Sequence, residues 1–228
     1  MEIDPAFLRV DHRGVYEVDE VGTRISEALP DLWEALEAFT SSDINSRRAG
    51  LDRLITLDVI HQSPMVAYIL ATRLDEPDLS LRTRVVMVLG DLLQPSTNGS
   101  NQVAQVKLQL SAYIAHMRTR RIFALLQVAD ANPSTHESIC RILNHCPFGG
   151  VQLGDLIADR SISLSIRKLA VDFIAEVGYL DALPSLERQF ARLERRMNGH
   201  QIDTLTEEDG DIWLLPSIQQ AMQVLRTP

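Results

Sequence analysis

The sequence contains few aromatic residues, few cysteines and no long apolar run. Aromatic types make up 5% of its 228 residues and hydrophobic types 45%. Leu, Ile, Val and Ala must therefore form most of the core, a composition that suits packed helices better than a β-sandwich. The cysteines, Cys140 and Cys146, are too few for a disulfide scaffold. Because no run of about 18 apolar residues occurs and the first residues lack the regions of a signal peptide, we expect a cytoplasmic protein without membrane contact.

The chain also lacks an excess of positive charge and any glycine-rich phosphate loop. Its formal net charge is -9, and an acidic chain repels phosphate backbones, so nucleic acid is an unfavoured partner. Neither GxGxxG nor GxxxxGK[ST] occurs in the sequence. The segment Phe148-Gly149-Gly150 follows a helical run and is predicted to be a turn. The sequence thus offers no nucleotide-binding motif.

What the sequence does contain is a helical pattern that recurs. In its clearest copy, Asp78 is placed to cap a helix N-terminus, and Arg82 follows four residues later. Apolar residues at +3, +7 and +10 from this arginine share one helix face. Gly90, at +8, is small enough to let a neighbouring helix approach closely. We therefore predict one amphipathic helix that packs against another.

The same register recurs elsewhere in the chain. Two more copies place a cap four residues before an arginine: Asp43 before Arg47, and Ser163 before Arg167. Pro64 and Pro184 lie 17 residues after those arginines (64−47 and 184−167), and each opens a new apolar stripe, as proline does in a first helical turn. Each unit is therefore expected to be a helix, a short turn and a second helix.

Two weaker copies complete the pattern. One takes His136 as origin with Asn132 as cap, and the other takes Leu215 as origin with Asp211 as cap. The interval after Arg82 holds a polar loop and two helix-like segments, at 94–102, roughly 102–117 and 119–130. Residues 1–40 precede the first copy; they read as an irregular stretch followed by one or two helices interrupted at Pro30.

The segments "DEPDLSLRTRVVMVLGDLL" (75–93) and "SISLSIRKLAVDFIAEVGYLDALPSLERQ" (161–189) resemble HEAT repeats. The resemblance implies an all-α fold, a right-handed α-solenoid of about five irregular helical pairs. It divides the chain into an N-terminal capping segment, 1–40, and one continuous repeat domain, 41–228. In this family the cap and the arginine often bond across neighbouring repeats, a structural role that the resemblance implies for Asp43, Asp78, Arg47, Arg82 and Arg167.

Two basic clusters stand out against the acidic average. The first contains Arg118, Arg120 and Arg121, and the second contains Arg188, Arg192, Arg195 and Arg196. Members of the second cluster are spaced to share a helix face. One interpretation is a surface of salt bridges with Glu187 and Glu194; the other is a groove for an acidic peptide or a phosphate backbone. Second helices of HEAT pairs usually line the concave face, where we expect both clusters to lie.

The sequence offers only weak candidates for metal ligands and catalytic residues. His136 and Cys140 are one turn apart on a predicted helix face, as zinc ligands often are. His145 and Cys146 are adjacent and cannot readily converge on the same ion. We favour the cysteines as small core residues and expect no metal, cofactor or catalytic residue. The sequence places several acids beside apolar stripes or in an acidic run, which read as solvated charges: Asp91, Asp155, Asp159, Asp172 and 204–211.

The favoured function is a non-catalytic interaction scaffold or regulatory subunit that binds a protein partner on its concave face. The oligomeric state and the identity of that partner are left open. One alternative is a HEAT-like nucleic-acid binder or DNA glycosylase-like enzyme, which would need a basic face with aromatic side chains. The tryptophans, Trp33 and Trp213, lie at opposite ends of the chain. A HEAT-like bilin lyase is a further alternative, based on fold-level resemblance alone.

Overall fold

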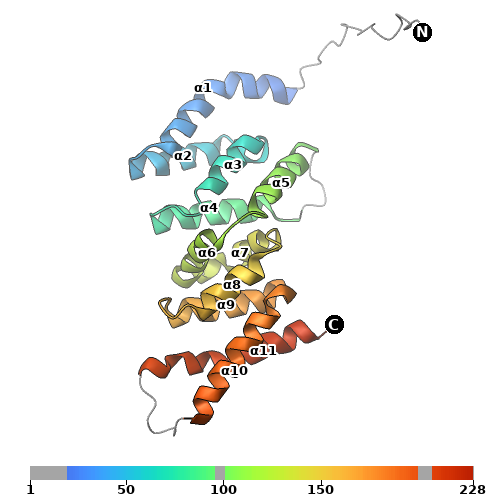
Figure 1. Ribbon diagram of the computed structural model, residues 1–228. Coiled ribbons are helices and arrows are strands. Elements are labelled where there is room, and N and C mark those ends of the chain that lie inside the picture. The colour runs from blue at the N-terminus through green and yellow to red at the C-terminus, as the bar shows by residue number, and fades with distance from the viewer. Residues whose placement is uncertain (1–19, 96–100, 200–206, 228) are drawn as a thin grey trace, which may run out of the picture. The chain divides into compact units, whose positions relative to one another are not determined.

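The computed structural model describes residues 20–95, 101–199 and 207–227, and these residues form helices and the connections between them, with no strand among them (Figure 1). The prediction of an all-α fold is therefore confirmed. The described residues fall into two compact units, one within Met1–Leu57 and one within Asp58–Pro228. The α-helices are α1 (Glu20–Thr40), α2 (Ile44–Thr56), α3 (Pro64–Thr72), α4 (Leu79–Leu92), α5 (Asn101–Ile114), α6 (Thr119–Ala131), α7 (His136–Asn144), α8 (Gly149–Ala158), α9 (Leu164–Val177), α10 (Leu183–Gly199) and α11 (Leu215–Arg226).

The N-terminal unit is a pair of helices, α1 and α2. The Asp43 carboxylate accepts a hydrogen bond from the Ser46 backbone N–H at 2.7 Å, which caps α2 as predicted. Gly50 lies so close to the Phe39 backbone that a Cβ would be 2.4 Å from its nitrogen. Pro30 lies inside α1, which continues through it as one helix. The irregular stretch predicted within residues 1–19 lies outside the described residues.

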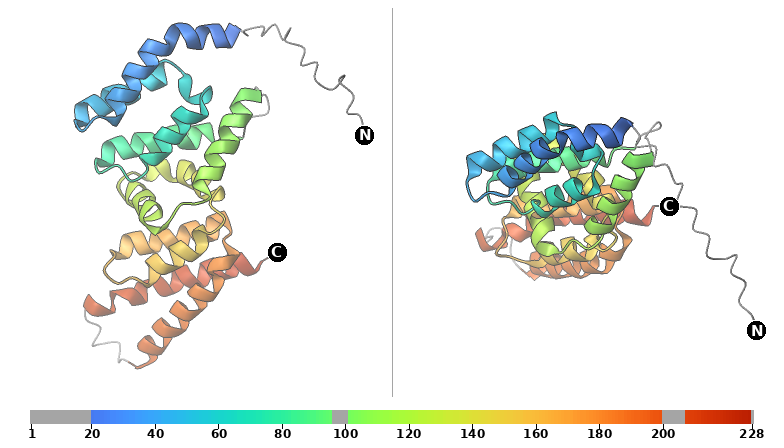
Figure 2. Two further views of the ribbon diagram at one scale, coloured as in Figure 1. Left: turned by 45° about the horizontal axis from the view of Figure 1, so that its top comes forward. Right: turned by 90° about the horizontal axis from the view of Figure 1, so that it is seen from above.

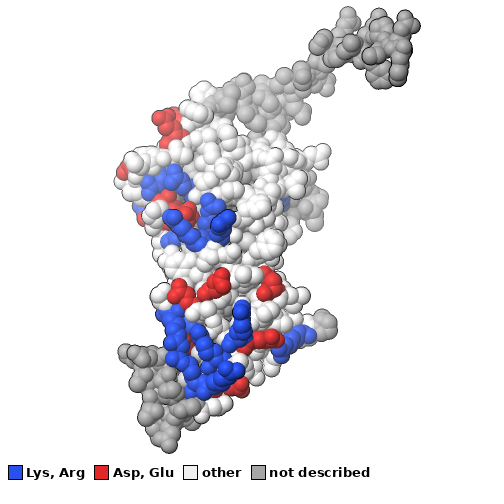
Figure 3. Space-filling view, in the orientation of Figure 1, with Lys and Arg blue, Asp and Glu red and all other residues white. Residues whose placement is uncertain are grey.

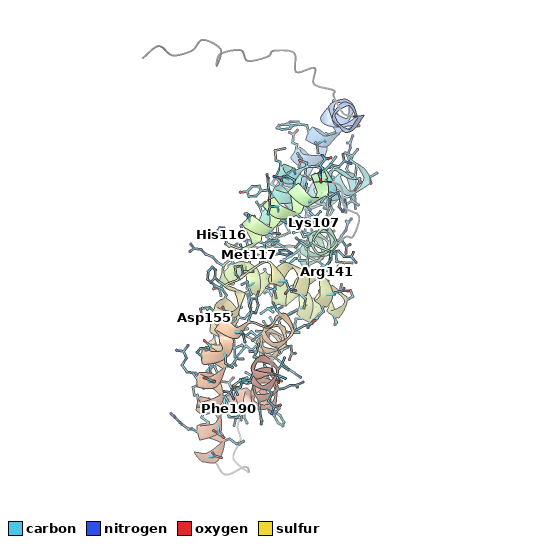
Figure 4. All side chains as sticks on the ribbon, turned by 90° about the vertical axis from the view of Figure 1, so that its right-hand side faces the viewer. Lys107, His116, Met117, Arg141, Asp155 and Phe190 are labelled. Atoms are coloured by element: carbon cyan, nitrogen blue, oxygen red, sulfur yellow. The ribbon has the colours of Figure 1, made fainter. Side chains whose placement is uncertain are left out.

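The C-terminal unit arranges its helices in two layers (Figure 2). In one layer α4 contacts α7, α7 contacts α9, and α9 contacts α11; in the other α6 contacts α8, and α8 contacts α10. Figure 4 shows Arg141 of α7 on one side of this unit and Asp155 of α8 on the other. Side chains between the layers, such as Leu89, Leu125 and Ile174, are fully buried. The apolar stripes of neighbouring helices thus share one core.

Local sequence explains where several of these helices begin and how closely they pack. Asp78 accepts a hydrogen bond from the Leu81 N–H at 2.8 Å and caps α4, and Pro64 is the first residue of α3. A Cβ on Gly90 would lie 2.4 Å from the Ser138 Cβ of α7. The close approach predicted at Gly90 is therefore present. Helices α5 and α6 also match the two helix-like segments predicted between 102 and 130.

Several local predictions were wrong. Gly149 and Gly150 do not form a turn after Phe148, because they are the first residues of α8. They are glycines for a packing reason: Tyr179 and Asp181 occupy the space that their Cβ atoms would need.

Three predicted caps form no side-chain capping bond with the α-helix that follows them: Asp211, Asn132 and Ser163. Asp211 does not cap α11, whose N-cap position is Leu214. Instead it lies in a 3-10 helix, η6 (Glu207–Leu214). Asn132 caps the 3-10 helix η3 (Pro133–Thr135) that precedes α7. Ser163 occupies the N-cap position of α9 without a side-chain capping bond. Parts of the predicted segments 94–102 and 204–211, namely 96–100 and 204–206, lie outside the described residues.

Candidate anion-binding site

Two of the repeat arginines lie buried at the fourth position of their helices. Arg82 of α4 is 8% exposed, and its Nη1 donates to Gln127 Oε1 of α6 at 3.0 Å. Burial lowers the pKa of Arg82, while the nearby carboxylates of Asp75, Glu76 and Asp78 raise it. This arginine therefore joins two helices through a neutral partner and has acidic residues around it.

Arg167 of α9 is held by charge. It is 3% exposed, its Nε donates to the Ile157 carbonyl at 2.8 Å, and its Nη1 pairs with the Asp211 carboxylate of η6. Asp211 is 9% exposed. A buried ion pair of this kind is stable only while both partners are present.

The same carboxylate is shared by further arginines. Arg160 Nε lies 3.1 Å from Asp211 Oδ2, and Arg196 Nη1 lies 4.0 Å from that oxygen. Burial raises the pKa of Asp211, but the Arg167 hydrogen bond and the charges of Arg167, Arg160 and Arg192 outweigh burial and hold this pKa below its usual value. Asp211 therefore remains ionised among several guanidinium groups.

Arg192 of α10 lies close to this carboxylate without bonding to it. Its Nε and Nη2 are buried and make no hydrogen bond within the described part of the chain. Burial lowers its pKa, as do the charges of Arg160, Arg196 and Arg167, while Asp211 raises it. We call the four residues around Asp211 the Asp211 arginine group; they are Arg160, Arg167, Arg192 and Arg196.

Two hollows adjoin this group. One, of about 480 Å³, is bordered by Arg160, Arg167, Arg196 and Asp211. The other, of about 320 Å³, lies between α8 and α10 and is bordered by Arg188 and Arg192 among others. Figure 3 shows lysine and arginine side chains gathered over α10 in the lower part of the view, with acidic side chains along their upper edge. The arrangement can accept an anion from solvent into a partly buried, positively charged site.

Only two of the four arginines predicted as a cluster on α10 belong to this site. Arg192 and Arg196 belong to the group, and Arg188 is exposed, donating to the Ser185 hydroxyl at 3.1 Å. Arg195 is exposed and is not among the arginines whose charges act on Asp211. The interpretation as a salt-bridged surface pairs Glu187 with arginines of α10. In the structure Glu187 instead lies 2.5 Å from Arg226 of α11.

The other predicted basic cluster lies at the start of α6, where two of its members contact Asp75, in the connection after α3, and Tyr113 of α5. Arg118 is the N-cap residue of α6. Arg120 Nε lies 3.2 Å from Asp75 Oδ2, and Arg121 lies over the Tyr113 ring at 5.1 Å from its centroid. Their charges are thus engaged locally and are not among those that act on Asp211.

Sequence reasoning missed Arg160 and assigned Asp211 to a helix cap. Asp211 is 44 residues from Arg167, and Arg160 lies in the connection between α8 and α9. In the sequence, Arg160 and Asp211 are each only a charged residue close to a predicted helix start. Such residues are common and do not indicate a site. Only the packing of η6 against α9 and α10 shows that these charges meet.

Of the metal-ligand candidates, His136 and Cys140 lie together and a third residue joins them. The His136 Nε2 lies 2.5 Å from Glu176 Oε2 of α9. Burial and the hydrogen bond to Glu176 raise the pKa of the Cys140 thiol to about 12. A Cys–His dyad needs an accessible thiolate, and this thiol is held protonated. Cys146 is fully buried and His145 is half-buried, and neither joins the cluster.

No helix in the described ranges is long and apolar enough to cross a lipid bilayer. Comparisons with protein families, curated proteins and solved structures find no match for the chain.

Proposed function

We propose that this chain is a non-catalytic interaction module whose Asp211 arginine group binds an acidic segment of a partner protein. The frame would be a right-handed HEAT-like α-solenoid, with the site on its concave face. Support for the frame comes from the two helical layers of the C-terminal unit and from the matching positions of Arg82 and Arg167. A cytoplasmic location belongs to the proposal, and it is supported by two free, buried cysteines.

The observation that carries the proposal is the unsatisfied guanidinium of Arg192. Nearly all buried polar groups in proteins have a hydrogen-bond partner, and a buried donor without one costs about 1–3 kcal/mol. The Arg192 Nε and Nη2 are such donors within the described part of the chain. They lie beside Asp211, which can balance only one of the four charges in the arginine group. A carboxylate from a partner would satisfy both the donors and the charge.

A short acidic peptide suits the site better than a nucleic acid. The chain carries a net charge of -9, which repels an extended polyanion, whereas a local group of arginines still attracts a few charges at close range. Exposed apolar side chains adjoin the group in sequence: Met197 follows Arg196, and Trp213, 76% exposed, follows Asp211 by two residues. Arginine, tryptophan and methionine together are typical of protein interfaces.

The test is the binding of a fluorescent oligo-glutamate peptide to the full chain, followed by anisotropy at low and moderate salt. An oligo-glutamine peptide and a DNA duplex serve as competitors. We expect the glutamate peptide to bind, the glutamine peptide not to compete, and binding to weaken as salt increases. Preferential binding of the duplex would instead support the nucleic-acid alternative and overturn this proposal.

A matched pair of variants on α10 locates the site. Arg192→Gln removes the unsatisfied guanidinium, and we expect about tenfold weaker peptide binding, equivalent to about 1.4 kcal/mol. Arg195→Gln removes an exposed charge from the same helix outside the arginine group, and we expect less than about a twofold change. Equal losses in both variants would mean that the peptide recognises only the general charge of α10.

A further inference from the structure

Three side chains with metal-binding atoms meet where α7 packs on α9. His136 and Cys140 are one turn apart on α7, and Glu176 reaches them from α9. The imidazole nitrogen, the thiol sulfur and a carboxylate oxygen all lie within 4.8 Å of one another. Within the described residues this is the only group of three such side chains so close together. The cluster is separate from the Asp211 arginine group and plays no part in the function proposed above.

The spacing of these atoms is close to what a tetrahedral ion needs. Zinc binds nitrogen and oxygen at about 2.0–2.2 Å and sulfur at about 2.3 Å, so the ligand atoms around it lie about 3.3–3.8 Å apart. The hydrogen bond between His136 and Glu176, 2.5 Å long, would have to open by about 1 Å to admit the ion. Rotation of the Glu176 side chain, which is half-exposed, can supply that movement without shifting either helix.

The surroundings hold the ligands in place and leave a path from solvent. The His136 ring stacks on Phe173, with centroids 4.4 Å apart and planes 17° apart, and Phe173 is fully buried. Cys140 forms the floor of the cluster at 8% exposure, while the His136 side chain, 35% exposed, lies at the rim. Packing that fixes a ligand ring is a usual feature of metal sites.

We propose that His136, Cys140 and Glu176 bind one divalent transition-metal ion of the zinc class, with a fourth position open to solvent. The mixed nitrogen, sulfur and oxygen set suits zinc and cobalt, and hard ions such as magnesium prefer oxygen alone. On binding, Cys140 releases its thiol proton to solvent and the thiolate bonds to the ion. The ion then replaces the hydrogen bonds that link Glu176 to Cys140 and His136. Since it contacts both α7 and α9, its binding also joins the two helices.

The experiment uses the untagged full chain, stripped of metal with a chelator and titrated with Co²⁺ under reducing conditions. We expect saturation at one ion per chain, with a thiolate-to-cobalt charge-transfer band in the near ultraviolet and visible bands of tetrahedral intensity. Adding Zn²⁺ should remove both. A titration without a thiolate band, or one in which the ion binds without saturating, would overturn the proposal.

Variants assign the ligands. Cys140→Ser should abolish the charge-transfer band, and His136→Asn or Glu176→Gln should weaken Zn²⁺ binding by about tenfold or more, at least the effect of losing an outer-shell partner. Cys146 and His145 serve as matched controls, because they carry the same ligand groups but lie outside the cluster. Cys146→Ser and His145→Asn should keep the cobalt spectrum. Because Cys146 is fully buried, circular dichroism of each variant must show the native helix content before its spectrum is interpreted. A band that survives Cys140→Ser and disappears in Cys146→Ser would refute the assignment.

Discussion

Arg82 and Arg167 are buried at the same position of their helices, yet their surroundings carry opposite charge. Arg82 donates to a neutral amide 45 residues later, and Arg167 pairs with a carboxylate 44 residues later. The acids Asp75, Glu76 and Asp78 surround Arg82, whereas Arg160, Arg192 and Arg196 surround the partner of Arg167. The same structural arginine thus occurs once in an acidic setting and once in a strongly basic one.

The comparison shows that the neighbours of a buried arginine, more than the arginine itself, indicate a binding site. Arg82 also keeps one buried nitrogen, Nε, without a hydrogen bond in the described structure, as Arg192 keeps two. An anion near Arg82 would be repelled by three carboxylates, whereas an anion near Arg192 would be attracted by the arginine group. Only the second region can therefore use its unsatisfied donors to bind an anion.

The largest loss of stability should come from removing the carboxylate of the basic region. Asp211→Asn leaves Arg167, 3% exposed, buried without a counter-charge, and we expect the free energy of unfolding to fall by about 3–5 kcal/mol. Urea denaturation followed by circular dichroism measures the loss. Sulfate should restore more stability to this variant than to the parent chain, because an anion in the adjoining hollow can replace the negative charge that the amide lacks. A loss below about 1 kcal/mol would contradict the buried-pair description.

The matching change in the acidic region should cost less. Gln127→Ala removes the partner of Arg82, and the loss of a hydrogen bond to a charged group should lower the free energy of unfolding by about 1.5–3 kcal/mol. The same urea experiment applies. Sulfate should stabilise this variant only as much as it stabilises the parent, since it acts generally by exclusion from protein surfaces. A specific rescue by sulfate here would remove the distinction between the two regions.

Removing an arginine from the basic region should have a small and opposite effect. Arg192→Gln deletes two unsatisfied donors and a charge beside Arg160 and Arg196. We expect the free energy of unfolding to rise by up to about 1 kcal/mol, although peptide binding weakens. Thermal unfolding of the purified variant tests this. A clear loss of stability would show that Arg192 serves the fold, and that its donors are satisfied in solution.

The smallest expected effect concerns pH, because many carboxylates titrate alongside Asp211. The folded pKa of Asp211 is depressed, so its contribution to stability is complete above the unfolded carboxyl pKa of about 3.9. The contribution is lost as the pH falls through the lower folded value. Between pH 5 and 3, the stability of the parent should therefore fall more steeply than that of Asp211→Asn. Parallel curves in acid denaturation would argue against the depressed pKa.

Features set by residues close in the sequence could be predicted, and those set by packing could not. Asp43, Asp78 and Pro64 mark helix starts because capping depends on backbone groups within three residues. Asp211 and Glu176 took part in no correct prediction, because their hydrogen-bond partners Arg167 and His136 lie 44 and 40 residues away on other helices. Where such side chains meet depends on how the helices pack, and spacing within one segment does not encode this packing.

Gly149 and Gly150 show the same limit in a local pattern. A pair of glycines after a helical run usually ends it, yet here the pair begins α8. The reason is the approach of Tyr179, 30 residues later in the chain (179−149), which leaves no space for a Cβ on Gly149. The sequence shows the glycine pair and Tyr179, but it does not show that they pack against each other.

Tyr179 also has a mechanical consequence. Its buried hydroxyl donates to the carbonyls of Leu143, at 2.6 Å, and Cys146, at 2.9 Å. Each of these carbonyls, at and just after the end of α7, also accepts a backbone N–H bond. The ring also packs on Gly149 at the start of α8, so one side chain fastens three segments. The connection between α7 and α8 should therefore be rigid. Amide hydrogens at the end of α7 and at the start of α8 should exchange as one cooperative unit.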